Sequence, residues 1–138
     1  MSEGPWLAEV AWAEENVFLG SDTSGHTIVY DSSDGTAKGI GPMRALLTCL
    51  GACTGMDVVA ILNKRKQHLR TFKMLISGER PERGVPKPWT SIHVKYFLSG
   101  ELDRKFVEEA INDSTEKFCH VGATLRPGVK ITHSYEIV

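Results

Sequence analysis

The feature that most constrains the fold of this chain is a long apolar segment in its first half, residues 45–62. Asp57 is its only charged side chain, and apolar side chains cover nearly every face when the segment is wound as a helix. Pro42 stands shortly before it, where a helix accepts proline, so the sequence predicts a helix over residues 42–67, about 39 Å long. A helix that is apolar all round must be buried on all sides. Because a chain of 138 residues offers little cover for it, we expect a partner subunit.

The same segment nearly reaches the length of a membrane span, but its composition favours the core of a soluble protein. It contains Asp57, glycines and threonines, and it starts beside Arg44. The first five residues show neither the basic nor the apolar region of a secretory leader. Cysteines in a chain without a leader indicate a reducing compartment. We therefore expect a cytoplasmic protein that does not use a membrane.

Length, charge and motifs exclude several classes of protein. The chain fits a single domain over residues 1–138, and 41% hydrophobic with 24% charged residues is typical of a globular protein. With 16 basic and 17 acidic side chains the net charge is −1, which does not call for a nucleic-acid partner. Phosphate-binding loops, zinc-protease motifs and dinucleotide fingerprints do not occur in the sequence. We expect no cofactor, no metal and no nucleic acid.

Hydrophobic alternation and turn residues predict strands on both sides of the long helix. Strands are predicted over residues 6–12, 17–19, 27–30, 71–77, 90–98 and 129–138, and an amphipathic helix over residues 102–118. The resulting order is an α+β pattern. Four histidines are interpreted as exposed or strand-face side chains without an identifiable partner: His26, His68, His93 and His133.

The three cysteines allow more than one interpretation. Cys49 and Cys53 lie one helical turn apart and share a face of the long helix, and Cys119 follows the second helix. The first interpretation is small apolar core side chains. The second is a soft metal site that also uses His120, although two ligands one turn apart inside a buried helix are unlike a zinc knuckle. The third is thiol chemistry, which needs a thiolate stabilised by a cation, hydrogen bonds or a helix N-terminus.

Two segments resemble a known family. Residues 41–62 resemble the central helix of the OsmC/Ohr family, the osmotically inducible and organic hydroperoxide resistance proteins, and contain the run Cys-Thr-Gly-Met-Asp-Val-Val of one OsmC-like branch. Residues 116–119, Glu-Lys-Phe-Cys, followed by Val121, are similar to the family's second cysteine site. The resemblance covers nearly the whole chain. It implies an OsmC-like α+β fold in which antiparallel sheets surround two long central helices of an intertwined homodimer.

The resemblance also implies an activity, that of an antioxidant thiol peroxidase in a stress response. Cys53 would attack the O–O bond of an organic hydroperoxide and become a sulfenic acid. Cys119 would resolve this sulfenic acid as a disulfide, which a dithiol reductant reopens. Cys49 has no counterpart in the family, and we expect it to have a packing role.

One part of the family's site is not identifiable in this sequence. Family peroxidases activate the thiolate with an arginine from the N-terminal sheet, oriented by a glutamate about three turns before the cysteine. Residues 1–43 contain no arginine, and Met43 or Arg44 takes the glutamate's place. Arg44, about 13 Å from Cys53 along the helix, and His120 are the candidate activating cations. The alternative functions are a non-enzymatic or weakly active protein that binds a small apolar ligand at the dimer interface, and thiol chemistry on another electrophile.

Overall fold

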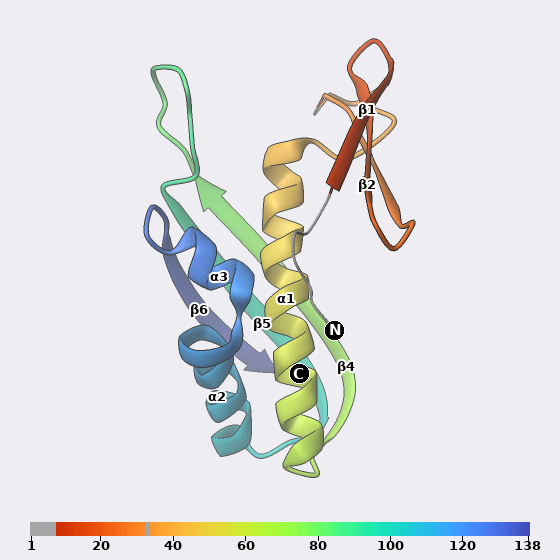
Figure 1. Cartoon of the computed structure of the whole chain (residues 1–138). Helices are drawn as coiled ribbons and strands as arrows, with labels where there is room; N and C mark the ends of the chain where they lie inside the picture. Colours follow the sequence, from red (N-terminus) through yellow and green to blue (C-terminus); the bar gives the residue numbers. More distant parts are fainter. Residues whose placement is uncertain (1–7, 33) are drawn as a thin grey trace. The chain divides into compact units, whose positions relative to one another are not determined.

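The computed structural model of this protein describes residues 8–32 and 34–138 (Figure 1). The chain divides into two compact units, of which the first ends at Leu46 and the second begins at Leu47, both within helix α1 (Pro42–Lys64). The helix begins at the predicted proline. It ends earlier than predicted because Lys66 takes a left-handed backbone conformation, with φ 57°.

The first unit contains a three-stranded antiparallel sheet near the predicted positions. Its strands are, in spatial order, β1 (Ala8–Glu14), β2 (Val17–Asp22) and β3 (Thr27–Tyr30). Residues 6 and 7 of the first predicted strand lie outside the described residues. Among the residues of these three strands only Val17 is buried, whereas Val10 and Trp12 are 66% and 67% exposed. The sheet therefore carries large apolar side chains that the chain leaves uncovered.

The second unit is built on a mixed sheet, which corrects the expectation of antiparallel sheets. Its strands are, in spatial order, β4 (His68–Glu79), β5 (Ser91–Glu101) and β6 (Lys130–Ile137). β4 and β5 form an antiparallel hairpin, but β6 runs parallel to β5. The reason is that the chain leaves β5 and returns through helices to the same end of the sheet, which is the connection that parallel pairing needs.

The second predicted helix is interrupted, which is a further correction. α2 (Arg104–Asp113) has Asp103 as its N-cap residue, whose side chain accepts a hydrogen bond from the Lys105 N–H. The π-helical turn η1 (Ser114–Phe118) follows α2. Cys119 then has an extended backbone, and the short helix α3 (His120–Leu125) follows it. Within residues 8–32 and 34–138 the structure therefore has two longer α-helices, α1 and α2, and in addition the short helix α3.

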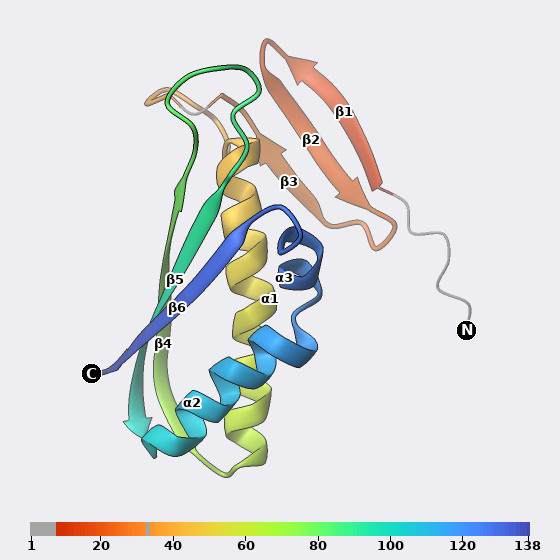
Figure 2. The same ribbon diagram turned by 90° about the vertical axis from the view of Figure 1, so that its left-hand side faces the viewer.

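The core of the second unit lies between its helices and one face of the mixed sheet. Figure 2 shows α1, α2 and α3 on the same side of this sheet. Alternate residues of β5 face the helices and are almost completely buried: Ile92, Val94, Tyr96 and Leu98. Leu50, Val58 and Leu62 of α1 pack into the same cluster. A β-carbon on Gly51 of α1 would come within 2.4 Å of the Ile76 Cδ1, so this glycine allows close packing on β4.

The opposite face of α1 is exposed in the single chain, in agreement with the expectation that this chain offers too little cover for it, whereas the expected partner subunit stays a prediction. Met56 is 72% exposed, and Leu46 and Val59 on the same helix are also exposed. By length and hydropathy α1 is capable of crossing a membrane, and 39% of its most apolar window is buried within the chain. The structure therefore has an apolar helix with one face packed on the sheet and one face open.

Candidate active site

The structure brings Cys53 and Cys119 together. Cys53 is half-buried in the middle of α1, and Cys119 is buried at the junction of η1 and α3. The two side chains are hydrogen-bonding neighbours, and the contact contributes to the raised pKa of the Cys119 thiol. All three cysteines are free thiols. One partly accessible and one buried sulfur therefore share a site within the second unit.

Cys119 occupies the N-cap position of α3, and its sulfur has two further polar neighbours. The backbone N–H of Gly122 donates to Sγ at 3.3 Å, and the Thr54 Oγ1 lies 3.3 Å from the same atom. Burial is the main cause that raises the pKa of Cys119, and the negative charge of Cys53 raises it further. The hydrogen bonds from Thr54 and Gly122 act in the opposite direction because they favour the thiolate.

A buried polar network continues from Thr54 into the sheet. The hydroxyl of Tyr96, on β5, forms hydrogen bonds with Thr54 and, at 3.0 Å, with the Nδ1 of His133 on β6. The two rings stack, with centroids 5.8 Å apart. Burial raises the pKa of Tyr96, and the charge of Cys119 raises it further. Thr115 of η1 lies 2.9 Å from the Nε2 of His133.

The expectation that His133 has no partner is therefore wrong. His133 stands beside Val94 in the β5–β6 register and shares its face of the sheet, so it lies next to Tyr96. Burial lowers the pKa of His133, and the positive charges of His93 and Arg126 add to this effect. His93 also has partners, since its ring nitrogens lie 2.6 Å from the Thr132 Oγ1 and 2.7 Å from the Ser134 Oγ.

A cleft of about 360 Å³ is lined by residues that follow Cys53 on α1 and that flank Cys119 in the sequence. Its lining residues are Asp57, Ala60, Ile61, Lys117, Phe118 and His120. Asp57 lies one turn after Cys53 on α1 and accepts a hydrogen bond of 2.8 Å from the Ser114 Oγ. His120 follows Cys119 directly and is exposed at the start of α3. The cleft combines an apolar wall with one carboxylate and two basic side chains.

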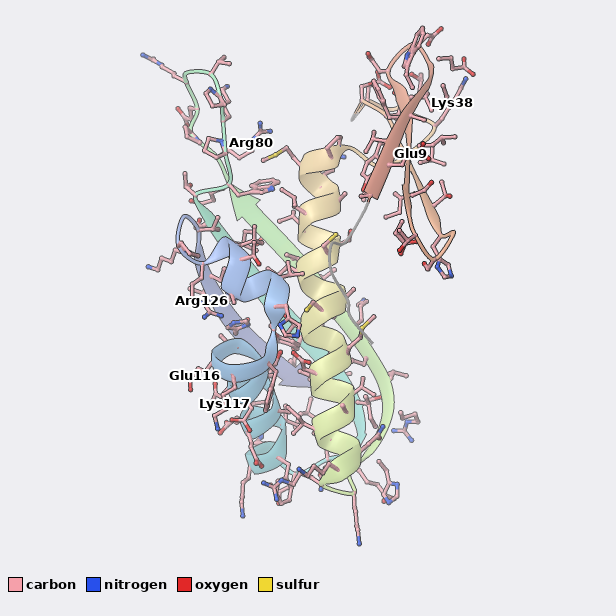
Figure 3. The ribbon with its side chains drawn as sticks, viewed as in Figure 1. Glu9, Lys38, Arg80, Glu116, Lys117 and Arg126 are labelled. Atoms are coloured by element: carbon pink, nitrogen blue, oxygen red, sulfur yellow. The ribbon has the colours of Figure 1, made fainter. Side chains whose placement is uncertain are left out.

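The cations predicted from the sequence differ in their positions. Arg44 is exposed in the first turn of α1, within the first unit, and His120 lines the cleft. Arg126 was not predicted: its guanidinium donates to the carbonyl of Thr115 and lies 3.5 Å from the point where a β-carbon on Gly122 would sit (Figure 3). The same point is 3.3 Å from the Cys119 Sγ, so Arg126 is a cation near the buried thiol of Cys119.

The metal-site interpretation of the cysteines has no geometric support. Cys49 is exposed on α1, and among residues 8–32 and 34–138 no group of three or more His, Cys, Asp or Glu side chains is arranged to hold a metal ion. The core interpretation fits Cys119, which belongs to the buried cluster, and in part Cys53, which packs against that cluster; it does not fit Cys49, which is exposed although a packing role was expected. The observed arrangement is one suited to thiol–disulfide chemistry between Cys53 and Cys119.

Comparison with known proteins gives the class of this α+β protein. Residues 35–134 match the family model described as OsmC-like protein. Protein YhfA of Escherichia coli strain K12 is 38% identical over 132 residues, which cover 95% of this chain and 97% of YhfA. A hypothetical protein from Aquifex aeolicus VF5 has a crystal structure with a TM-score of 0.82 and 32% identity, over 97% of this chain and 98% of that one.

More distant structures share the fold. An organic hydroperoxide resistance protein OsmC from Legionella pneumophila has a TM-score of 0.71 and 15% identity, over 99% of each chain. The fold, the family model and the relatives agree with the resemblance seen in the sequence. This chain belongs to the OsmC family.

Proposed function

We propose that this protein is a thiol peroxidase that reduces organic hydroperoxides with Cys53 and Cys119. The observation that carries the proposal is the contact between a half-buried thiol on α1 and a buried thiol at the start of α3. The accessible sulfur is the one that a substrate reaches, and the buried sulfur is protected until its neighbour is oxidised. A fold relative named for organic hydroperoxide resistance supports the same chemistry.

The proposed cycle has three steps. The Cys53 thiolate attacks one oxygen of the hydroperoxide, so that an S–O bond forms, the O–O bond breaks and the alkoxide takes a proton to leave as the alcohol. The Cys119 sulfur then attacks the sulfenic sulfur, and the hydroxyl leaves as water. A dithiol reductant reduces the disulfide to two thiols and is itself oxidised to a disulfide. We expect this reductant in a reducing cytoplasm.

The apolar wall of the cleft supports an organic substrate. Ala60, Ile61 and Phe118 form apolar lining, and Phe118 is 48% exposed. An alkyl or aryl hydroperoxide gains from contact with such a wall, whereas hydrogen peroxide has no apolar part to bury. We propose Arg126 and His120 as the cations that take the place of the family's missing arginine, because both lie next to Cys119 or Gly122.

We also propose that the protein is an intertwined homodimer. The open face of α1, with Met56 and Val59, and the uncovered apolar side chains of the first sheet, with Val10 and Trp12, supply surface that a second copy would bury. Large exposed apolar surfaces of this kind mark interfaces.

The proposed activity is tested by measuring hydroperoxide consumption with a dithiol reductant. We expect Cys53→Ser to reduce turnover to the background rate, because the attacking sulfur is lost. Cys49→Ser is the matched control, since it removes an exposed thiol one turn away and leaves the pair intact. Equal background rates in the wild type and Cys53→Ser would contradict the peroxidase and favour the binding of a small apolar ligand.

The pairing of the cysteines is tested separately by mass spectrometry. After stoichiometric peroxide without reductant, we expect the mass to fall by one pair of hydrogens, mapped to a peptide that joins Cys53 and Cys119. Sulfinic acid on Cys53 with a free Cys119 would show that Cys119 does not resolve the intermediate.

A further inference from the structure

The chain Cys119–Thr54–Tyr96–His133 links the buried thiol to the sheet. We propose that it is a proton relay that removes the proton of Cys119 when this sulfur forms the disulfide. The proposal rests on the proposed function for its place in the cycle. His133 is the proton acceptor, and Tyr96 and Thr54 are positioning residues that connect it to the reacting sulfur.

The direction of each hydrogen bond follows from the outer end of the network. Thr115 has one hydroxyl proton, which it donates to the Ile111 carbonyl at 2.8 Å. Its oxygen must therefore accept from His133, so the proton of the neutral ring is assigned to Nε2, 2.9 Å away. The other nitrogen, Nδ1, is then free to accept the hydroxyl proton of Tyr96.

The single hydroxyl protons of Tyr96 and Thr54 set the directions of the hydrogen bonds nearer the thiol. Because the proton of Tyr96 points to His133, its oxygen accepts from Thr54, which agrees with the effect of this hydrogen bond on the pKa of Tyr96. While the proton of Thr54 points to Tyr96, its oxygen is open to the S–H of Cys119, 3.3 Å away, and either atom of this pair can be the donor. The S–H has Cys53 as a second acceptor, so the relay begins when it turns to Thr54; after the transfer the Thr54 hydroxyl donates to the thiolate, which is the direction that lowers the pKa of Cys119. In this arrangement all donors point from the thiol toward an unprotonated imidazole nitrogen.

The end of the chain is suited to receive a proton and to release it. His133 lines a cavity of about 270 Å³ together with Glu108 of α2 and Tyr135 of β6. The charged and titratable groups that act on its ring are Tyr96 on β5, Arg126 after α3 and Glu108 on α2, together with His93 on β5, which acts from the opposite face of the sheet. Burial lowers the pKa of His133, and the charges of His93 and Arg126 lower it further, which favours the neutral ring, the state that accepts a proton.

The proposed step transfers one proton from Cys119 to His133 and forms one disulfide bond. The S–H bond of Cys119 breaks, its proton moves to Thr54, the proton of Thr54 moves to Tyr96, and the proton of Tyr96 moves to Nδ1. The Cys119 sulfur forms a bond with the Cys53 sulfur, the S–O bond of the sulfenic acid breaks, and the hydroxide takes a proton from solvent. The imidazolium then loses its proton through the cavity, so that the net products are the disulfide and water.

The test needs no peroxide. In a Cys49→Ser background, Cys53 is converted to a mixed disulfide with dithiobis(nitrobenzoate), and attack by Cys119 releases the coloured nitrothiobenzoate. This leaving group needs no proton, so the rate of release as a function of pH reports the loss of the Cys119 proton. We expect Tyr96→Phe and His133→Gln to slow the release at neutral pH by about 10²-fold, the lower end of what a positioned base contributes. We also expect their pH profiles to move to higher pH.

Two comparisons separate the relay from a structural role. Tyr30→Phe is the matched control for Tyr96→Phe, since Tyr30 lies on β3 in the first unit and takes part in neither the relay nor the lining of the cavity. Thr54→Val removes the first link with little change of shape, and Thr54→Ser restores the hydroxyl. We expect slow release from the valine variant and rescue by serine, which keeps the test decisive if Tyr96→Phe does not fold.

The outcomes distinguish the relay from the peroxidase. pH profiles of Tyr96→Phe, His133→Gln and Thr54→Val that coincide with the parent profile would overturn the relay, whatever the peroxide activity. Shifted profiles in a protein that consumes no hydroperoxide would overturn the peroxidase and retain the relay.

Discussion

At the scale of single residues, the proposed role of His133 as a proton acceptor depends on its ring being neutral in the folded protein. Burial is the first cause that lowers the pKa of His133 in the folded protein. A group with a lowered pKa binds fewer protons in the folded than in the unfolded state. Its contribution to the free energy of unfolding is therefore complete above the ordinary histidine value of about 6.5 and is lost as the pH falls through it.

The corresponding prediction concerns stability against pH. We expect the free energy of unfolding of the wild type to fall between about pH 7 and pH 5, and this fall to be smaller in His133→Gln. Urea unfolding at both pH values measures the fall in the free energy of unfolding for each variant. His93→Gln is the control, because the burial of His133 remains in that variant and most of the fall should persist. An identical fall in the wild type and His133→Gln would show that His133 is not held neutral by folding.

Residues of the candidate site differ in how far they are predictable from sequence. Cys53 and Cys119 stand within segments that resemble the family, so the sequence alone makes them candidates. It does not do so for His133 and Tyr96, because their contact depends on the parallel register that sets His133 beside Val94. A strand's periodicity gives which residues share a face, but not which neighbour lies beside them. The position of Arg126 near Cys119 depends in addition on the path of the backbone around Gly122.

At the scale of elements, the α+β order followed from hydrophobic periodicity and α1 from its long apolar segment and Pro42, while the junction between α2 and α3 had no such signal. The π-helical turn over residues 114–118 ends in the extended backbone of Cys119, which also caps α3. Wide turns of this kind occur mostly as short bulges at functional sites and have little sequence signature. The interruption matters because it directs the Cys119 sulfur toward Thr54 and Gly122.

The pairing of β4 with β5, which positions Tyr96, gives a prediction about glycine. Gly100 has φ +135°, and a β-carbon there would lie 2.0 Å from the carbonyl oxygen of His68. We expect Gly100→Ala to lower the free energy of unfolding by more than about 3 kcal/mol, since both the backbone angle and the contact are strained. Gly84→Ala is the control, with φ +97° but nothing within 4 Å, and should cost about 1 kcal/mol. Equal costs in thermal or urea unfolding would show that the close contact is relieved by a backbone shift.

At the scale of the whole molecule, the two cysteines and the relay lie in one unit of one chain, whereas the apolar surface lacks cover. All four relay residues belong to the second unit, so the disulfide step requires no group from a partner. The open face of α1 near the cleft, in contrast, is not complete in one chain, because Met56 and Phe118 are exposed to water there. A second copy would exclude this water and complete an apolar binding site for the substrate.

The dimer is tested by substitution on that face. We expect the wild type to have twice the chain mass of 15.2 kDa in sedimentation experiments, and Met56→Glu to dissociate it. Loss of a buried methionine costs about 1.5–3 kcal/mol, and symmetry counts it twice, so the dissociation constant should rise by about 10²-fold or more. Leu75→Glu on β4 is the matched control, since Leu75 is also an exposed large apolar residue, at 57%, but lies away from α1. If Leu75→Glu dissociated the dimer while Met56→Glu did not, the interface would lie on the mixed sheet, and the open face of α1 would need another explanation.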